Sequence, residues 1–249
     1  MGANKTLKIK KFWDEQAKKY GTNSLATMPD TYLKQIEIQI LNKYIKKGNT
    51  VLDAGCGNGA TAKELLKLKD IDISGIDYSK EMIEQARINL QKTSTEFKVL
   101  DITKPMKFMP TYDVVFTERV LINIPTILEQ KRAIANIAKL LPKGGLFLIC
   151  EDTQQGLKKL NRLRKQAGLD EVETHWHNLY LDEKVIIRSA KQYFNLVKTE
   201  NFSSTYYIAS RIFNASKNPN YLAKINKIAS KLEAIGDYGP LKLFVLRKK

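Results

Sequence analysis

Apolar residues recur along the chain at two spacings, and the spacing changes near residue 49. In residues 1–48 the apolar positions lie three or four residues apart, as on one face of a helix. The clearest set is Leu33, Ile36, Ile40, Leu41 and Tyr44. Further along, short apolar runs each end in a polar or small residue, and they occupy residues 50–54, 71–77, 96–101, 113–117 and 146–151. We expect a helical N-terminal segment followed by a region of short strands.

Helical patterns separate these runs. Their apolar members are Ala62, Leu65 and Leu66, then Met82, Ile83, Ala86 and Leu90, and then Ile127, Ile134, Ile137, Ala138 and Leu141. Strands that alternate with helices form a parallel sheet with helices on both faces. Because the crossovers are right-handed, the loops after the strands gather along one edge of the sheet. We therefore expect the polar residues that end the runs to converge on one crevice.

The C-terminal part of the chain follows a different pattern. Residues 152–182 are expected to form an irregular insert with 'THWHNLYLDE' near its end, 185–191 a helix, and 193–200 and 241–246 the last two strands. Before the final strand, an amphipathic helix is predicted from Leu222, Ile225, Ile228, Ala229, Leu232 and Ile235. An insertion of this length beside a sheet edge is usually a cap or a contact surface. The prediction is one domain, 1–249, with a helical lid (1–48), a core (49–151) and a substrate-side cap region (152–249).

Composition narrows the class of protein. The chain has 249 residues, of which 43% are apolar, and no apolar run approaches the roughly 20 residues of a membrane span. Its first twenty residues lack the apolar centre of a secretory signal. Two Cys and two His residues form neither a disulfide framework nor a zinc cluster. We expect a reduced, cytoplasmic protein that binds no metal and is not attached to a membrane.

The charge balance leaves two interpretations open. Forty-two basic and 26 acidic residues give a formal net charge of +16, which would attract nucleic acid if the charge were concentrated on one surface. The basic residues are mostly lysine and are spread along the chain, whereas nucleic-acid sites usually combine arginine with interleaved aromatic residues. A solvated basic surface is therefore favoured, and a nucleic-acid partner remains the alternative.

The strongest chemical signal is the sequence 'VLDAGCGNGA' at residues 51–60, in which an apolar run leads into a glycine loop and a helix. Glycine lets the backbone approach a ligand closely. The loop also satisfies a loose dinucleotide fingerprint, but Asp53 would repel a pyrophosphate and suits the cationic amino-acid end of S-adenosylmethionine. Asp77 ends the next run, where a carboxylate is expected to accept ribose hydroxyls, and the alternative is a helix N-cap. Asp101 ends the third run, where a short acceptor is expected to meet an adenine amino group, and the alternative is a loop residue that caps a turn.

Five motifs follow one another over residues 49–151. They are 'VLDAGCGNG', 'GIDYSKEMIEQAR', 'VLDIT', 'YDVVFTERVLINI' and 'LPKGGLFLICE'. In these motifs the sequence resembles the class I S-adenosylmethionine-dependent methyltransferases. The resemblance implies a Rossmann-like α/β fold, with a seven-stranded, mostly parallel sheet that the last strands complete as an antiparallel hairpin.

The resemblance also implies a cofactor site for S-adenosylmethionine. By their place in the motifs, its residues are Asp53, Gly55 and Gly57 around the methionine part, Asp77 at the ribose, Tyr78, Met82, Asp101 and Ile102 at the adenine, Glu118 on the sulfonium side, and Tyr20 closing over the cofactor. The residue matching Tyr20 belongs to 'FWDEQAKKYG', which is similar to the opening helix of many family members that act on small molecules.

Methyl transfer to a hydroxyl group requires a base in addition to positioning. His177 is the favoured candidate because polar aromatic residues surround it in the sequence, and Glu151, at the end of the fifth run, is the second. The alternatives are that His177 is an ordinary loop residue and that Glu151 is a helix cap or salt-bridge partner. Arg119 is expected either to hold an acidic group of the substrate or to pair with Glu118 or Glu129.

The predicted function is O-methylation of a small polar acceptor, such as a sugar or a similar biosynthetic intermediate. The segment 'TERV' stands where methyltransferases of bases and glutamine amides carry an Asn/Asp-Pro-Pro-aromatic signature, which disfavours those substrates. An RNA or protein methyltransferase that uses the basic surface is one alternative. A non-catalytic methyltransferase-like scaffold subunit and a nicotinamide-dependent oxidoreductase are the others.

Overall fold

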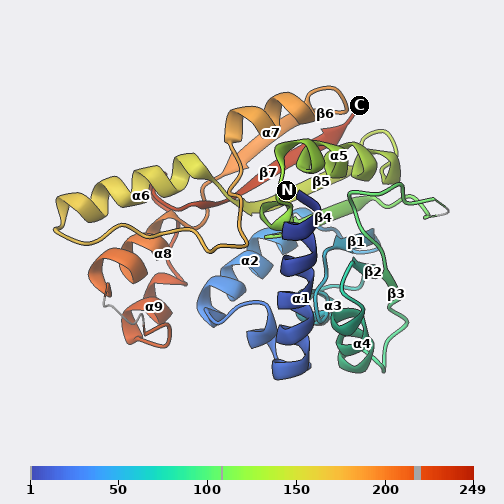
Figure 1. Cartoon of the computed structure of the whole chain (residues 1–249), viewed down its shortest axis with the longest axis horizontal. Helices are drawn as coiled ribbons and strands as arrows, with labels where there is room; N and C mark the ends of the chain where they lie inside the picture. The colour runs from blue at the N-terminus through green and yellow to red at the C-terminus, as the bar shows by residue number, and fades with distance from the viewer. Residues whose placement is uncertain (1, 108, 216–219) are drawn as a thin grey trace.

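The computed structural model describes residues 2–107, 109–215 and 220–249. Within them, seven strands form one sheet in the order β3-β2-β1-β4-β5-β7-β6 (Figure 1). The strands are β1 (Thr50–Ala54), β2 (Asp72–Asp77), β3 (Phe97–Val99), β4 (Val114–Glu118), β5 (Leu146–Asp152), β6 (Phe194–Glu200) and β7 (Leu241–Lys248). The first five pair in parallel, and β7 runs antiparallel between β5 and β6. The predicted Rossmann-like seven-stranded α/β fold is confirmed.

Helices cover both faces of this sheet. They are α1 (Gly2–Tyr20), α2 (Thr31–Tyr44), α3 (Ala60–Leu68), α4 (Lys80–Asn89), α5 (Ile127–Ile137), α6 (Gln154–Gln166), α7 (Glu183–Ala190), α8 (Ser204–Ile208) and α9 (Lys224–Ala229). Buried side chains of α2, α3, α4, α6 and α8 pack in one core, and those of α5 and α7 pack in a second core. Figure 1 shows α5 and α7 above the sheet, α3 and α4 below it, and α1 in front.

Short polar side chains start most of these helices. The side chain of the capping residue accepts a hydrogen bond from a backbone N–H of the first turn at Asp30, Ser79, Thr126, Thr153 and Asp182. Such caps satisfy N–H groups that have no partner inside the helix. Because several of these caps directly follow strands or lie beside the sheet edge, they fix where each helix begins relative to the crevice.

Two sequence-based expectations in the C-terminal part are wrong. Residues 152–182 are not wholly irregular, because they contain α6, whose narrow leucine stripe is masked by charged residues. The helix predicted over residues 222–235 forms only at α9. Of its apolar residues Ala229 is buried, whereas Leu222, Leu232 and Ile235 stay exposed. A helix gains most of its stability from burying an apolar face, and this segment finds little apolar surface to cover.

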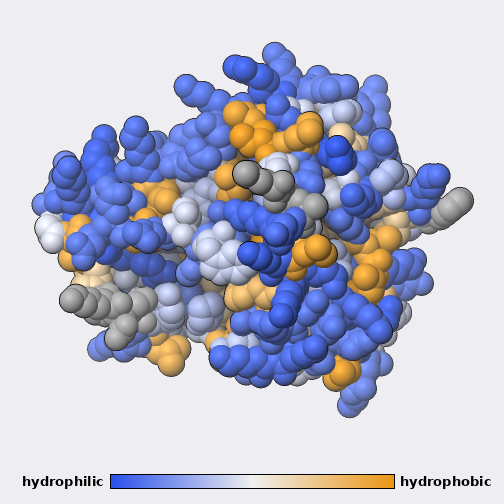
Figure 2. Space-filling model, viewed as in Figure 1, coloured by the Kyte–Doolittle hydropathy of each residue, from blue (hydrophilic) through white to orange (hydrophobic). Residues whose placement is uncertain are grey.

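The face of the molecule seen in Figure 2 is mostly hydrophilic, with small separate groups of apolar side chains. None of the helices in the described part of the chain is both long and apolar enough to cross a membrane.

Candidate functional site

A cavity of about 750 Å³ lies at the C-terminal ends of the parallel strands. Its walls come from the loops after β1, β2, β3 and β4, from α1 and α2, and from the segments after β5 and α8. Every residue predicted to bind the cofactor lines this cavity: Tyr20, Asp53, Gly55, Gly57, Asp77, Tyr78, Met82, Asp101, Ile102 and Glu118. The sheet edge therefore gathers residues that lie far apart in the sequence.

The glycine loop between β1 and α3 has a backbone that other residues would strain. Gly55 and Gly57 have positive φ angles of 98° and 51°. A Cβ atom on Gly55 would lie 2.3 Å from Cγ2 of Val120, and one on Gly57 would lie 2.8 Å from Cγ2 of Thr27. The absence of side chains at Gly55 and Gly57 thus lets a ligand approach the backbone of the loop closely.

Replacing Gly55 by alanine should destabilise the protein and weaken binding of S-adenosylhomocysteine. The added methyl group costs backbone strain and also forces Val120 away, for a loss of about 1–3 kcal/mol in the free energy of unfolding. Gly144→Ala is the matched control, because Gly144 has a φ of 85° but a Cβ added there would meet no atom within 4 Å. Denaturant unfolding of both variants checks the prediction, and equal losses would show that the contact with Val120 carries no cost.

Asp53 is the acidic group closest in sequence to this loop. The residue is only 2% exposed, and its Oδ2 atom has no hydrogen-bond partner among the described residues. Burial, with the nearby carboxylates of Glu118 and Asp77, raises the pKa of Asp53 well above its usual range. A buried carboxylate without a partner is unfavourable alone and is satisfied by a cationic ligand. The ammonium group of S-adenosylmethionine fits this requirement.

Asp77 holds the loop from the neighbouring strand. Its Oδ2 accepts the Gly57 N–H at 3.0 Å and its Oδ1 accepts the Ser79 N–H at 2.8 Å. Burial raises the pKa of Asp77 to about 6, although these two hydrogen bonds lower it. At neutral pH the ionised carboxylate is thus fixed in orientation and has further lone pairs for a ribose diol.

The predicted adenine end is mostly apolar. Met82 and Ile102 are buried, and the hydroxyl of Tyr78 has no hydrogen-bond partner among the described residues. Oδ1 of Asp101 accepts two hydrogen bonds from Thr103, through the backbone N–H at 2.8 Å and the hydroxyl at 2.7 Å. Asp101 is therefore oriented by its own turn and still lines the cavity. These features fit a flat aromatic base with polar edges.

The N-terminal helix α1 crosses the cavity and is tied to its rim. Asp14 accepts a hydrogen bond from the Ser79 hydroxyl at 2.6 Å, and the Trp13 indole donates to Oδ1 of Asn123 at 3.3 Å. Tyr20, at the end of α1, packs in the same small cluster as Met82. The ring of Tyr20 is therefore placed beside the predicted adenine pocket. Asn123 also donates from its Nδ2 atom to the backbone carbonyl of Arg119 at 2.6 Å, so both ends of its amide are held by the protein.

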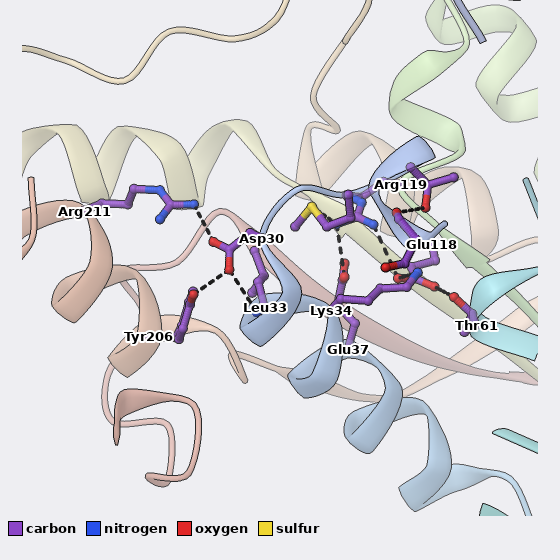
Figure 3. A network of polar contacts seen from close by, with 12 residues as sticks. Asp30, Leu33, Lys34, Glu37, Thr61, Glu118, Arg119, Tyr206 and Arg211 are labelled. Atoms are coloured by element: carbon purple, nitrogen blue, oxygen red, sulfur yellow. Dashed lines mark hydrogen bonds and ion pairs between the residues drawn. The ribbon is translucent and has the colours of Figure 1, made fainter. Parts of the chain in front are cut away.

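Glu118 ends β4 within a network of buried charges (Figure 3). Lys34 donates to its Oε1 at 2.6 Å and the Thr61 hydroxyl donates to its Oε2 at 2.6 Å. Burial alone would raise the pKa of Glu118, but Lys34 and Arg119 outweigh burial and lower it to about 2. Glu118 lines the cavity as predicted, yet both of its oxygens already have partners from the protein.

Arg119 completes this network, and the structure shows the ion pairing that was one of the two roles left open for it. It donates to Glu37 at 3.0 Å and to Glu118 at 3.4 Å, and not to Glu129. Arg119 has a φ of 55° and is the only non-glycine residue with a positive φ in the described segments. Such a strained conformation often occurs at functional sites. Figure 3 shows that Lys34 and Glu37 reach the network from α2, so the N-terminal helical segment supplies two of its members.

Glu151 does not fit the predicted catalytic role. Its side chain is fully buried and does not line the cavity. Its carboxylate accepts the backbone N–H groups of Val120 and Leu121 at 2.9 Å and of Ile122 at 3.2 Å. Burial raises the pKa of Glu151 to about 7, although these hydrogen bonds lower it. Glu151 therefore caps the short helix η2 (Leu121–Asn123), which is the helix-cap alternative.

His177 lines the cavity where the segment before α7 packs against α1. Its ring stacks on Phe12 with centroids 4.7 Å apart, and it meets the edge of Trp13 at 5.6 Å. Burial, with His175 and Lys5 nearby, lowers the pKa of His177 to about 4, so the ring is neutral at pH 7. Its Nδ1 atom has no hydrogen-bond partner in the described part of the chain. The role predicted for His177 stays a prediction.

The sequence interpretation missed several charged residues of the site. Lys34 and Glu37 lie among the apolar positions of α2, and a charge at such a position is the signal that would have indicated them. Arg211 follows α8 and pairs with Asp30 at 3.0 Å (Figure 3). Asp152 directly follows Glu151 and lines the cavity. Among the described residues, no three His, Cys, Asp or Glu side chains are arranged to hold a metal ion.

Comparison with known proteins gives one family. Residues 45–203 match the family model of a methyltransferase domain. A carboxy-S-adenosyl-L-methionine synthase of Desulfotalea psychrophila is 29% identical over 183 residues, which cover 68% of this chain and 74% of that protein. A ubiquinone biosynthesis O-methyltransferase of Vibrio cholerae is 25% identical over 196 residues, which cover 72% of this chain and 79% of that protein.

A similar solved structure shows that the fold is shared. The N-methyltransferase NodS of Bradyrhizobium japonicum, in complex with S-adenosyl-L-homocysteine, has a TM-score of 0.59 at 14% identity, over 95% of this chain and 98% of that chain. The family match spans most of the chain and agrees with the glycine loop and the acidic residues of the cavity. The chain therefore belongs to the methyltransferase domain family, as a class I enzyme that depends on S-adenosylmethionine.

Proposed function

We propose that this enzyme methylates a hydroxyl group of a small polar acceptor, with a sugar or similar hydroxylated ring as the preferred class. The observation that carries the proposal is the composition of the cavity beyond the cofactor residues. There the walls combine aromatic rings and hydrogen-bonding groups, including Trp176, His177 and Tyr180. Aromatic faces and polar donors together suit a hydroxylated ring.

The cofactor supplies an activated methyl group on its sulfonium. The task of the protein is then to bind the acceptor, to orient its oxygen toward that methyl group and to exclude water. Positioning of this kind supplies about 7–11 kcal/mol of barrier reduction. Helix α1 serves it by closing over the cavity through Asp14 and Trp13. The cofactor and the acceptor would then bind in the same cavity, part of whose wall is formed by α1.

His177 is proposed to accept a hydrogen bond from the acceptor at its Nδ1 atom, which is buried and has no hydrogen-bond partner among the described residues. Replacing it by alanine should lower turnover by roughly tenfold, which is the effect of one lost hydrogen bond to a buried group. The affinity for S-adenosylhomocysteine should not change. His177→Phe should lose turnover equally while it keeps the ring stacked on Phe12. Steady-state kinetics check this prediction, and full activity of the phenylalanine variant would remove the proposed contact.

The proposal is tested first on the cofactor and then on the acceptor. Calorimetric titration with S-adenosylhomocysteine, with NAD as a parallel control, should give micromolar or tighter binding of the thioether alone. Methyl transfer from radiolabelled S-adenosylmethionine is then measured with D-glucose, D-glucuronate, catechol, total RNA and a protein extract. Transfer to a hydroxyl compound supports the proposal. Transfer only to RNA or protein would favour the macromolecular alternative, and binding without any transfer would favour a scaffold role.

A further inference from the structure

The cavity has a cofactor half and an acceptor half, which follow the order of the strands. Asp77, Asp53 and Glu118 lie at the ends of β2, β1 and β4, which are adjacent in the sheet. The next strand on the far side of β4 is β5. A group at the end of β5 therefore lies beside the sulfonium position and away from the ribose and adenine positions. The last residue of β5 is Asp152.

Asp152 and Glu151 point to opposite sides of the sheet, because successive side chains of a strand alternate. Glu151 turns toward the backbone of η2, and Asp152 turns into the cavity. A sequence motif that ends at Glu151 cannot distinguish these two neighbouring carboxylates. The structure does, because only one of them lines the cavity.

The carboxylate of Asp152 is buried and has a free acceptor atom. The residue is 5% exposed, and its Oδ1 atom has no partner among the described residues. The groups that face it are the cations Arg119 and Arg211, from the segments that follow β4 and α8, and the phenols Tyr180 and Tyr207. Arg119 and Arg211 are already paired with Glu37 and Asp30. The Oδ1 atom of Asp152 is therefore left for a ligand.

We propose that Asp152 is the catalytic residue that takes the proton of the acceptor hydroxyl during methyl transfer. This inference rests on the proposed function. The acceptor oxygen forms a bond to the methyl carbon while the carbon–sulfur bond breaks, and the electron pair of that bond stays on sulfur. The hydroxyl proton passes to Asp152 and leaves to water when the product departs. The result is a methyl ether, a thioether and a protonated carboxyl group, so atoms and charge balance.

The chemistry of the two candidate groups agrees with this assignment. Burial raises the pKa of Asp152 to about 6, although Arg119 and Arg211 lower it. A base of this strength is ionised at neutral pH and still accepts a proton as the hydroxyl oxygen becomes acidic in the transition state. The lowered pKa of His177, about 4, makes that ring a hydrogen-bond acceptor and a weaker base. In this proposal the base role predicted for His177 passes to Asp152, and His177 keeps the role of hydrogen-bond acceptor.

The test uses the full chain, saturating S-adenosylmethionine, and the hydroxyl compound with the fastest turnover among those named above. The maximal rate of the wild type should fall about tenfold per pH unit below pH 6, because Asp152 is protonated there. Asp152→Asn should lower this rate by about 100-fold and should lose the acidic limb. Its affinity for S-adenosylhomocysteine should stay within about twofold of the wild type. Asp70→Asn, at an exposed site, is the matched control.

Each outcome decides the assignment. An unchanged rate in Asp152→Asn, or an acidic limb lost instead in His177→Phe, would overturn the role of Asp152 and leave the proposed function standing. A wild-type rate that is flat from about pH 5 to 7.5 would overturn it without any variant, even if Asp152→Asn failed to fold. If the wild type methylates none of the hydroxyl compounds, the proposed function fails and this inference fails with it.

Discussion

Replacing Glu118 by alanine should lower the free energy of unfolding by about 3–5 kcal/mol, the usual cost of removing one partner from a buried ion pair. The side chains of Lys34 and Glu118 are only 10% and 5% exposed, and their charged atoms lie 2.6 Å apart. Without the carboxylate, the largely buried ammonium group of Lys34 would lose its ionic partner. Arg119 would also lose one of its two carboxylates.

Denaturant unfolding of Glu118→Ala, Lys34→Met and the double variant at pH 7.5 measures this effect. The double variant should be more stable than Glu118→Ala, because it no longer buries an uncompensated charge. Glu84→Ala is the control, since the pair of Glu84 with Lys80 is exposed and spans 3.7 Å; its loss should stay below about 1 kcal/mol. Equal losses for Glu118→Ala and Glu84→Ala would contradict the buried-pair account.

The pH dependence of this contribution follows from the lowered pKa of Glu118. The folded-state pKa is about 2 and the ordinary value is 4.5. Stability from the pair is therefore fully present above about pH 4.5 and is lost as the pH falls toward 2. Between pH 5 and 8 the Glu118 contribution should not change.

Most motif residues of the cofactor site could be placed from the sequence because they lie at the end of a strand or directly after it. Asp53 and Asp77 lie at the ends of parallel strands, and parallel strands must bring their ends to one edge. The charge network could not be placed in this way, since Lys34 and Glu118 are 84 residues apart. Their contact depends on how α2 packs on the sheet, and the periodicity of α2 does not contain that information.

The end of β5 and the segment after residue 220 also differ from what the sequence pattern predicts. Whether Glu151 or Asp152 enters the cavity depends on strand parity, and the predicted run ended one residue before β5 does. For the segment after residue 220, periodicity predicted a helix whose apolar face the fold leaves largely uncovered, as at Leu222 and Ile235. Pattern alone indicates that a face is apolar, and tertiary packing decides whether anything covers it.

Replacing Asp77 by alanine should weaken binding of S-adenosylhomocysteine by about 10- to 150-fold at pH 7.5, since hydrogen bonds to a buried charged group contribute about 1.5–3 kcal/mol. The variant loses the acceptor for the ribose hydroxyls and also the bonds that hold the N–H groups of Gly57 and Ser79. Asp101→Ala should have a smaller effect, because Oδ1 of Asp101 is already bound to Thr103 within its own turn. Calorimetric titration compares the two variants.

The pH dependence of binding separates the charge of Asp77 from its shape. Because the pKa of Asp77 is about 6, the wild type should bind the thioether less tightly as the pH falls from 7.5 to 5, when the carboxylate becomes protonated. Asp77→Asn keeps the shape and one oxygen acceptor, so its affinity should be lower at pH 7.5 and should vary less over the same range. A pH dependence that persists unchanged in Asp77→Asn would show that the titrating group is not Asp77. Unchanged affinity in Asp77→Ala would show that the ribose is held elsewhere in the cavity.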